Sequence, residues 1–210
     1  VVAKSRAARA PAGGAWRRSV GLVADNGESF VRVCDSIRLD ETPPDVNPRA
    51  VYLPRLAFED NFYIPPEALE GSVTKVSPVA TRMIESLFED GVAILGFFGH
   101  GSPNIWSDWR MWFGGDSPNS DNLRLTNGDR LPLVFNGTCN SGAIDYPLPK
   151  WNICISEDML RQREGGALAC FVPSGPGFTT SHEILSKALF RGAFRLGIRR
   201  GKAPSRGFRG

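Results

Sequence analysis

The sequence predicts an α/β fold in which a mainly parallel sheet carries helices on both faces. The apolar runs at 92–98, 131–135 and 167–172 are continuous rather than alternating, as in strands that are buried on both sides. Segments with helical periodicity separate several of the runs, which is typical of strand–helix–strand units. The chain has 210 residues, of which 41% are hydrophobic, so it can form one large domain with a substantial core.

The first part of the chain predicts two strands and one helix. Residues 20–24 form a short apolar run that ends at the turn signal Asp25-Asn26-Gly27. Residues 31–39 carry a modest apolar stripe and are interpreted as a helix. Several prolines then interrupt the chain before a short strand at 50–53, and residues 55–76 show no clear period.

A well-marked helix follows this irregular stretch. Ser77 suits its N-cap, Pro78 its first turn and Gly91 its C-cap. The helix leads directly into the strand at 92–98. Its apolar side chains fall on one face, which predicts that this face is buried: Val79, Met83, Ile84, Leu87 and Phe88.

The last part of the chain alternates between strands and helices. Residues 102–122 are rich in Gly, Pro, Ser, Asn and Trp and are interpreted as a long loop before the strand at 131–135. A helix at 156–164 then leads to the strand at 167–172. A final helix is predicted at 183–196.

Basic residues are concentrated at both ends of the chain, whose net charge is +3. Residues 1–18 and 199–210 contain no acidic residue and are interpreted as basic, disordered tails around one domain at 19–198. The tails contain few aromatic residues, which favours solvated tails over a nucleic-acid site. No nucleic-acid partner is therefore expected.

Several other classes of protein do not fit the sequence. No apolar run approaches the roughly 20 residues of a membrane span. Four cysteines are too few and too scattered for a disulfide scaffold, and no zinc-ligand spacing occurs, so no metal site is predicted. The first 15 residues lack the apolar core of a signal peptide.

Two short segments carry the candidate chemistry. Gly99-His100-Gly101 follows one predicted strand, and 136–142, with Cys139 at its centre, follows the next. Ligands of open α/β sheets bind beyond the carboxyl ends of the strands, so this His and Cys form a candidate pair of nucleophile and proton donor. Glycines around His100 allow a ligand to approach closely, and small polar neighbours leave the Cys139 thiol accessible. The second histidine, His182, lies in a predicted first helical turn and is interpreted as structural.

These segments resemble those of the gingipain family of cysteine peptidases. The His segment shares His100-Gly101-Ser102 and Trp106 with that family. Glu157 and residues 166–169 match the helix and strand that follow, so the detailed resemblance covers about 92–171. The nucleophile segment shares, in the same order and spacing, Leu125-Thr126-Asn127, Leu131-Pro132, Phe135, Cys139 and Gly142.

The resemblance implies a caspase-like fold and a cysteine endopeptidase that acts on proteins or peptides through an acyl-enzyme. His100 would protonate the leaving amine and Cys139 would carry the acyl group. The N–H groups of Gly101 and Cys139 would form the oxyanion hole, and Trp106 would line the substrate cleft. The family further implies a secreted or cell-surface protein. It is compatible with bound calcium, for which no ligands can be assigned, and no other cofactor is expected.

Some alternatives remain open at the level of sequence. The acid that orients His100 could be Asp25, Glu41, Glu59 or Asp60, which all fall near predicted strand ends or loops upstream. The chain could also be another caspase-like peptidase, such as a separase-related one, or a catalytically inactive binding module on the same fold. The sequence does not indicate the preferred substrate side chain, the oligomeric state or an activation cleavage.

Overall fold

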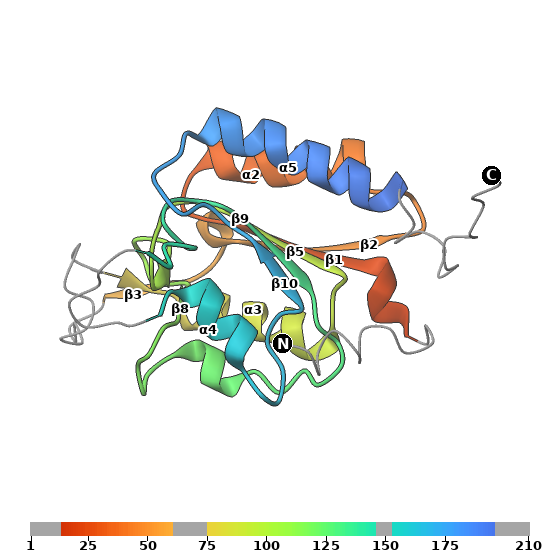
Figure 1. Ribbon diagram of the computed structural model, residues 1–210. Coiled ribbons are helices and arrows are strands. Elements are labelled where there is room, and N and C mark those ends of the chain that lie inside the picture. The colour runs from red at the N-terminus through yellow and green to blue at the C-terminus, as the bar shows by residue number, and fades with distance from the viewer. Residues whose placement is uncertain (1–13, 61–74, 146–152, 196–210) are drawn as a thin grey trace.

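A five-stranded parallel sheet forms the centre of the molecule (Figure 1). The computed structural model describes residues 14–60, 75–145 and 153–195. The strands lie in the order β10-β9-β5-β1-β2, and every neighbouring pair is parallel, which confirms the predicted sheet. Their bounds are β1 Ser19–Ala24, β2 Asn47–Tyr52, β5 Ile94–Phe98, β9 Leu133–Gly137 and β10 Ala169–Phe171.

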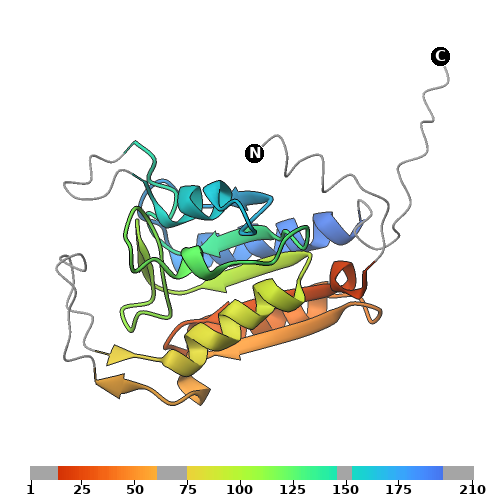
Figure 2. The same ribbon diagram turned by 90° about the horizontal axis from the view of Figure 1, so that it is seen from below.

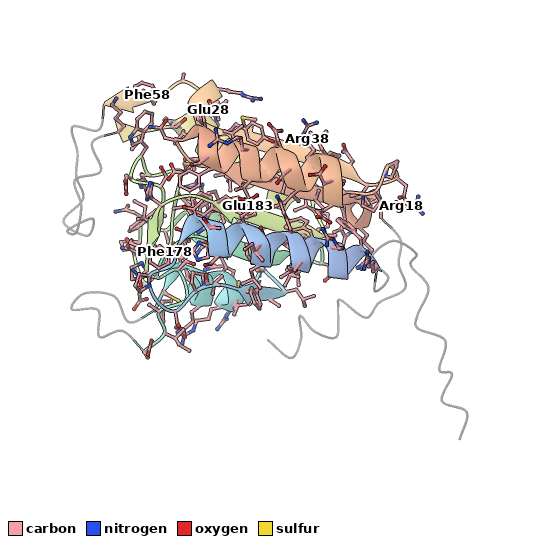
Figure 3. All side chains as sticks on the ribbon, turned by 90° about the horizontal axis from the view of Figure 1, so that it is seen from above. Arg18, Glu28, Arg38, Phe58, Phe178 and Glu183 are labelled. Carbon is pink, nitrogen blue, oxygen red and sulfur yellow. The ribbon has the colours of Figure 1, made fainter. Side chains whose placement is uncertain are left out.

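Helices cover both faces of this sheet, as predicted. Helices α2 (Glu28–Ser36) and α5 (Thr179–Ala193) lie side by side on one face, which Figure 3 shows from above. Helices α3 (Pro78–Asp90) and α4 (Ile155–Arg161) lie on the other face, turned toward the viewer in Figure 2. The molecule therefore has three layers.

The core is divided between the two faces of the sheet. Successive side chains of a strand point to opposite faces, so Leu22 and Val23 of β1 belong to different apolar clusters. Leu22 packs in the cluster that contains Phe30 of α2 and Phe190 of α5. Val23 packs in the cluster that contains Leu87 of α3 and, further along the sheet, residues of α4. Continuous apolar strands are needed because both faces are covered.

Helix α3 has the ends that its sequence predicts. The Ser77 hydroxyl accepts a hydrogen bond from the N–H of Ala80 at 3.3 Å, and Pro78 occupies the first turn. Gly91 ends the helix with a φ of 89°, a backbone conformation that favours glycine. The chain is thereby turned directly toward β5.

The structure differs from the prediction in several short elements. Residues 102–122 are not a simple loop, because β7 (Ile105–Trp106) and β8 (Trp112–Phe113) join β6 (Gly101–Ser102) in an antiparallel sheet. Helices α2 and α5 also begin earlier than predicted. Further short elements are η1 (Ala15–Arg18), the π-helical turn η2 (Ile37–Glu41), η3 (Leu53–Arg55), the antiparallel pair β3 (Glu59–Asp60) and β4 (Lys75–Val76), and η4 (Asp121–Arg124).

The two predicted tails fall mostly outside the described residues. Residues 1–13 and 199–210 belong to the parts that are not described. Residues of the η1 turn lead into β1, so the ordered domain begins before residue 19. Within the described ranges, no helix is long and apolar enough to cross a membrane.

Candidate active site

Strands β5 and β9 bring His100 and Cys139 to the same edge of the sheet. The two strands are adjacent and parallel, and Phe98 pairs with Gly137 in their register. His100 and Cys139 each follow two residues after this pair. The N–H of Gly99 donates to the carbonyl of Gly137 at 3.2 Å and continues the contact past the strand ends. Since neighbouring parallel strands lie about 4.7–4.9 Å apart, the two segments leave the sheet side by side.

Cys139 lies at the start of a sharp turn that a second segment holds in place. Its thiol is free, half-buried and directed to the carbonyl of Gly177, with an Sγ–O distance of 3.8 Å. Asn140 has a φ of 57°, a conformation that Asn tolerates better than most residues. Its N–H donates to the carbonyl of Gly175 at 3.1 Å, and the N–H of Gly142 donates to that of Pro173 at 2.9 Å. Residues 173–177 therefore run along the turn that contains Cys139.

The backbone of His100 is held from both sides. Its N–H donates to Oδ2 of Asp25 at 2.8 Å, and its carbonyl accepts from the N–H of Ser107 at 2.9 Å. The His100 side chain is exposed, and its imidazole meets the ring of Phe30 edge to face, with centroids 5.3 Å apart. The main chain is thus fixed while the ring stays accessible.

Asp25 is the acid candidate that the structure brings to His100. It follows β1, the strand next to β5, and only 2% of it is exposed. Burial raises the pKa of its carboxyl, and hydrogen bonds from the Ser107 hydroxyl and from the N–H groups of His100 and Asn26 offset part of this rise. The hydrogen bond that joins Asp25 to His100 is thus made by the main-chain N–H of the histidine.

The other acid candidates lie elsewhere in the fold. Glu41 pairs with Arg191 of α5, with one N–O distance of 2.9 Å, and this arginine lowers the pKa of the glutamate. Glu59 is exposed in β3. The side chain of Asp60 lies outside the described residues.

Gly101 begins β6 in close contact with Thr138, the residue before Cys139. A Cβ at this position would lie 2.4 Å from Oγ1 of Thr138, so a larger residue would displace Thr138. The Thr138 hydroxyl is buried and has no hydrogen-bond partner in the described part of the chain. The absence of a side chain at Gly101 therefore permits the approach of β6 to the end of β9.

Trp106 does not lie where the sequence suggested. It was expected to line a substrate cleft, but its side chain is fully buried and stacks on Phe97 of β5 with ring centroids 4.7 Å apart. With the amide of Asn136 oriented to satisfy its neighbours, its oxygen accepts from the indole N–H at 3.3 Å. Trp106 is thus a core residue that anchors β7 to β5 and β9, because an aromatic at this spacing can face either the cleft or the core.

His182 lies closer to the turn that contains Cys139 than its position in the sequence suggested. Its ring packs on Gly177, where a Cβ would lie 2.3 Å from Nε2. Burial lowers the pKa of the imidazole, which favours its neutral form. Sequence reasoning missed this contact, and it also missed Ser107 and Phe30. The glycine-rich run 173–177 was the available signal, since glycines often mark close packing.

No group of three or more His, Cys, Asp or Glu side chains that could hold a metal ion occurs within the residues that the structure describes. Calcium therefore has no candidate ligand set there.

Comparison with known proteins gives one family and a consistent set of relatives. The family model described as peptidase family C25 matches residues 1–207. Gingipain R2 of Porphyromonas gingivalis is 28% identical over 88 residues, which are 42% of this chain and 11% of that protein. Gingipain R1 of the same organism is 27% identical over 88 residues, or 8% of its length.

Solved structures agree with these relatives. A structure described as a protease has a TM-score of 0.60 at 16% identity, over 89% of this chain and 36% of the other. The crystal structure of the Arg-specific cysteine proteinase gingipain R has a TM-score of 0.54 at 17% identity, over 84% of this chain and 37% of the other. The fold is therefore caspase-like, and the chain spans about a tenth of its curated relatives and about a third of the solved ones.

Proposed function

Because the chain belongs to peptidase family C25, we propose that it is a cysteine peptidase domain that cleaves peptide bonds through Cys139 and His100. The observation that carries the proposal is the register of β5 and β9, in which both residues follow the same strand pair by two positions. A nucleophile and a proton donor at one sheet edge are what acyl transfer requires. Proteins or peptides are the proposed substrates.

In the proposed reaction the sulfur of Cys139 attacks the carbonyl carbon of the scissile bond, and the thiol proton passes to His100. His100 then gives a proton to the leaving amine as the C–N bond breaks, which leaves a thioester on Cys139. Water, deprotonated by His100, hydrolyses the thioester and restores the thiol.

The negative charge that develops on the carbonyl oxygen needs donors in place before the reaction. We assign this role to the N–H groups of Gly101 and Cys139. Preorganised donors of this kind lower a barrier by about 2.7–4 kcal/mol each. The close packing of Gly101 on Thr138 supports the assignment, because it brings the two main-chain segments together.

Asp25 is the proposed positioning residue for His100. It is the candidate acid with a hydrogen bond to that residue, at 2.8 Å to the main-chain N–H. Ser107 completes the arrangement by bonding to both Asp25 and the carbonyl of His100. The pair fixes the peptide units on either side of the histidine.

Family membership also supports a location outside the cytoplasm, secreted or at the cell surface. Fractionation of the producing cells with an antibody to this domain tests this directly. Recovery only from the cytoplasmic fraction would contradict it.

The first prediction is that Cys139→Ala abolishes hydrolysis of a fluorogenic peptide library, while Cys170→Ala retains it. Cys170 is the matched control because it is also a half-buried cysteine in the described part of the chain. His100→Ala should lower kcat by about 10²–10⁴-fold, since that is the usual contribution of a positioned acid–base group, and His182→Ala should lower it much less. A thiol-directed peptide chloromethyl ketone should attach one probe molecule per chain, at Cys139, as measured by mass spectrometry.

Two results would contradict this proposal. Hydrolysis above background in Cys139→Ala would mean that another group is the nucleophile. A folded wild-type chain that takes up no probe and cleaves no peptide would instead indicate an inactive binding module.

A further inference from the structure

A cavity of about 700 Å³ lies between α3 and the segment 110–124, apart from the residues of the candidate active site. Neither Cys139 nor His100 lines it. Its size falls within the range of small-molecule sites in proteins. Its wall carries three arginines, Arg82, Arg110 and Arg124, and two carboxylates.

The two carboxylates are already committed to one of these arginines. Arg124 lies 2.7 Å from Asp121 and 3.3 Å from Glu85. Asp121 is nearly buried and also accepts from the N–H of Phe113 at 2.7 Å. Arg124, Asp121 and Glu85 therefore pair with one another. The other two arginines of the wall, Arg82 and Arg110, are not part of this group.

Arg110 has few partners for its charge. Its closest carboxylate contact is 4.0 Å, to Asp121, which is beyond hydrogen-bond distance. Its Nε is buried and has no hydrogen-bond partner among the described residues. The guanidinium lies over the ring of Phe113, 5.3 Å from the centroid. One flat side of the guanidinium is therefore covered by the aromatic ring, and the N–H groups at its edge can donate to a planar acceptor such as a carboxylate.

The backbone at Arg110 is strained. Its φ is 41°, in the left-handed region that side chains other than Gly, Asn and Asp rarely adopt. Strained residues that persist in a fold are concentrated at ligand-binding and catalytic sites. Arg82, in the first turns of α3, is exposed and has no carboxylate partner within the described ranges. Two arginines without full partners thus face one cavity.

The neutral and acidic parts of the wall narrow the class of ligand. Proline and aliphatic side chains, including Val76 and Leu123, line the cavity beside the arginines. Glu85 and Asp121 would repel a second negative charge on a ligand. A singly charged, planar carboxylate on a partly apolar body fits this wall better than a phosphate dianion does.

We propose that the cavity between α3 and segment 110–124 binds a carboxylate group carried by a peptide, with Arg110 as its main partner and Arg82 as its second. An acidic side chain next to an apolar one supplies both features of the wall. The proposal concerns binding alone and does not depend on the peptidase chemistry.

The test is calorimetric titration of the full chain with the acetylated, amidated peptide Leu-Glu-Leu, which carries a single negative charge. Cys139→Ala serves as the background, so that cleavage cannot consume the probe. We expect saturable one-to-one binding that weakens at least about tenfold in Arg110→Gln, since a charge-assisted hydrogen bond is lost. Arg82→Gln, an exposed change that leaves the fold intact, should weaken it by a smaller factor.

The controls separate a specific site from general attraction to a basic protein. Arg32→Gln removes the same charge from the exposed surface of α2 and should leave binding unchanged. The capped peptide Leu-Gln-Leu should not bind saturably, and inorganic phosphate should not displace the acidic peptide at equal concentration.

Three results would overturn the proposal. The first is that the acidic peptide shows no saturable binding. The second is that folded Arg110→Gln and Arg82→Gln bind it as tightly as the background protein does. The third is that Arg32→Gln weakens binding as much as Arg110→Gln does. Tighter, Arg110-dependent binding of phosphate would overturn the choice of a carboxylate.

Discussion

Single residues around His100 determine how the site is held, and Asp25 is the most constrained of them. Its buried carboxyl receives donors from His100, Asn26 and Ser107. An ionised acid accepts all three, whereas an amide has one acceptor oxygen and a donor NH₂ group. The chemistry of this position therefore bears directly on where His100 lies.

Asp25→Asn is expected to lower kcat by about 10²-fold, because a small displacement of a catalytic group costs about that factor. The pH dependence of stability should change as well. The raised folded-state pKa of Asp25 contributes stability that is present below about pH 3.8 and is lost as the pH rises through the raised value. The difference in unfolding free energy between the two proteins, measured by urea titration between pH 4 and 7, should follow this slope. A difference that does not vary with pH, with unchanged kcat, would contradict the role of Asp25.

Gly101→Ala should reduce kcat by about 10²-fold or more, since the new Cβ would meet Oγ1 of Thr138 at 2.4 Å and move the residue before Cys139. Overpacking of this kind also costs about 1–3 kcal/mol of stability. Gly192→Ala is the control, because nothing lies within 4 Å of a Cβ there. Steady-state kinetics and urea unfolding measure both effects. Wild-type kinetics in a folded Gly101→Ala protein would show that the approach of β6 to β9 does not matter.

At the scale of elements, the stacking of Trp106 on Phe97 joins β7 to the central sheet. Trp106→Ala should cost about 3–5 kcal/mol because it removes a fully buried indole from Phe97. Trp106→Phe keeps the stacking and loses the bond to Asn136, so it should cost about 1 kcal/mol. For peptides that vary in the residue before the scissile bond, each KM of Trp106→Phe should equal that of the wild-type protein. A KM change that depends on the substrate side chain would mean that Trp106 touches the substrate.

The elements that the sequence predicts well are those with a long, regular pattern. Helix α3 has a cap, a proline, a buried face and a terminal glycine, β5 is a continuous apolar run, and β9 begins with three apolar residues. Strands β6, β7 and β8 have two residues each, too few for a period to emerge. The early start of α5 at Thr179 lacks a side-chain cap that would have marked it.

The site was predictable where it depends on strand ends and unpredictable where it depends on strand order. His100 and Cys139 follow apolar runs, which places both at the same edge of the sheet once the strands are taken as parallel. Asp25 could be chosen among four acids only once β1 was found beside β5. Trp106 was misplaced because its spacing does not indicate which side of β7 faces the core.

At the scale of the whole molecule, α5 secures one face of the sheet mainly by apolar packing. Phe190 is fully buried in the cluster with Leu22 and Phe98, whereas Arg191 pairs with Glu41 at the surface. Phe190→Ala should therefore destabilise the domain by about 3–5 kcal/mol. Arg191→Gln should lower the thermal unfolding midpoint less than Phe190→Ala does, because the arginine side chain is 54% exposed and solvent weakens its ion pair with Glu41. Equal shifts in the two variants would indicate that the ion pair holds the helix.

The strand order also has a consequence for when the site comes into being. His100 is bonded to Asp25, 75 positions earlier, and the Cys139 thiol contacts Gly177, 38 positions later. At about 5–20 residues per second, a ribosome adds Gly177 roughly 2–8 s after Cys139. During that interval the nascent chain carries its thiol without the segment that runs along it. Any cleaving ability therefore arises only after the chain has been extended past the fifth strand of its central sheet.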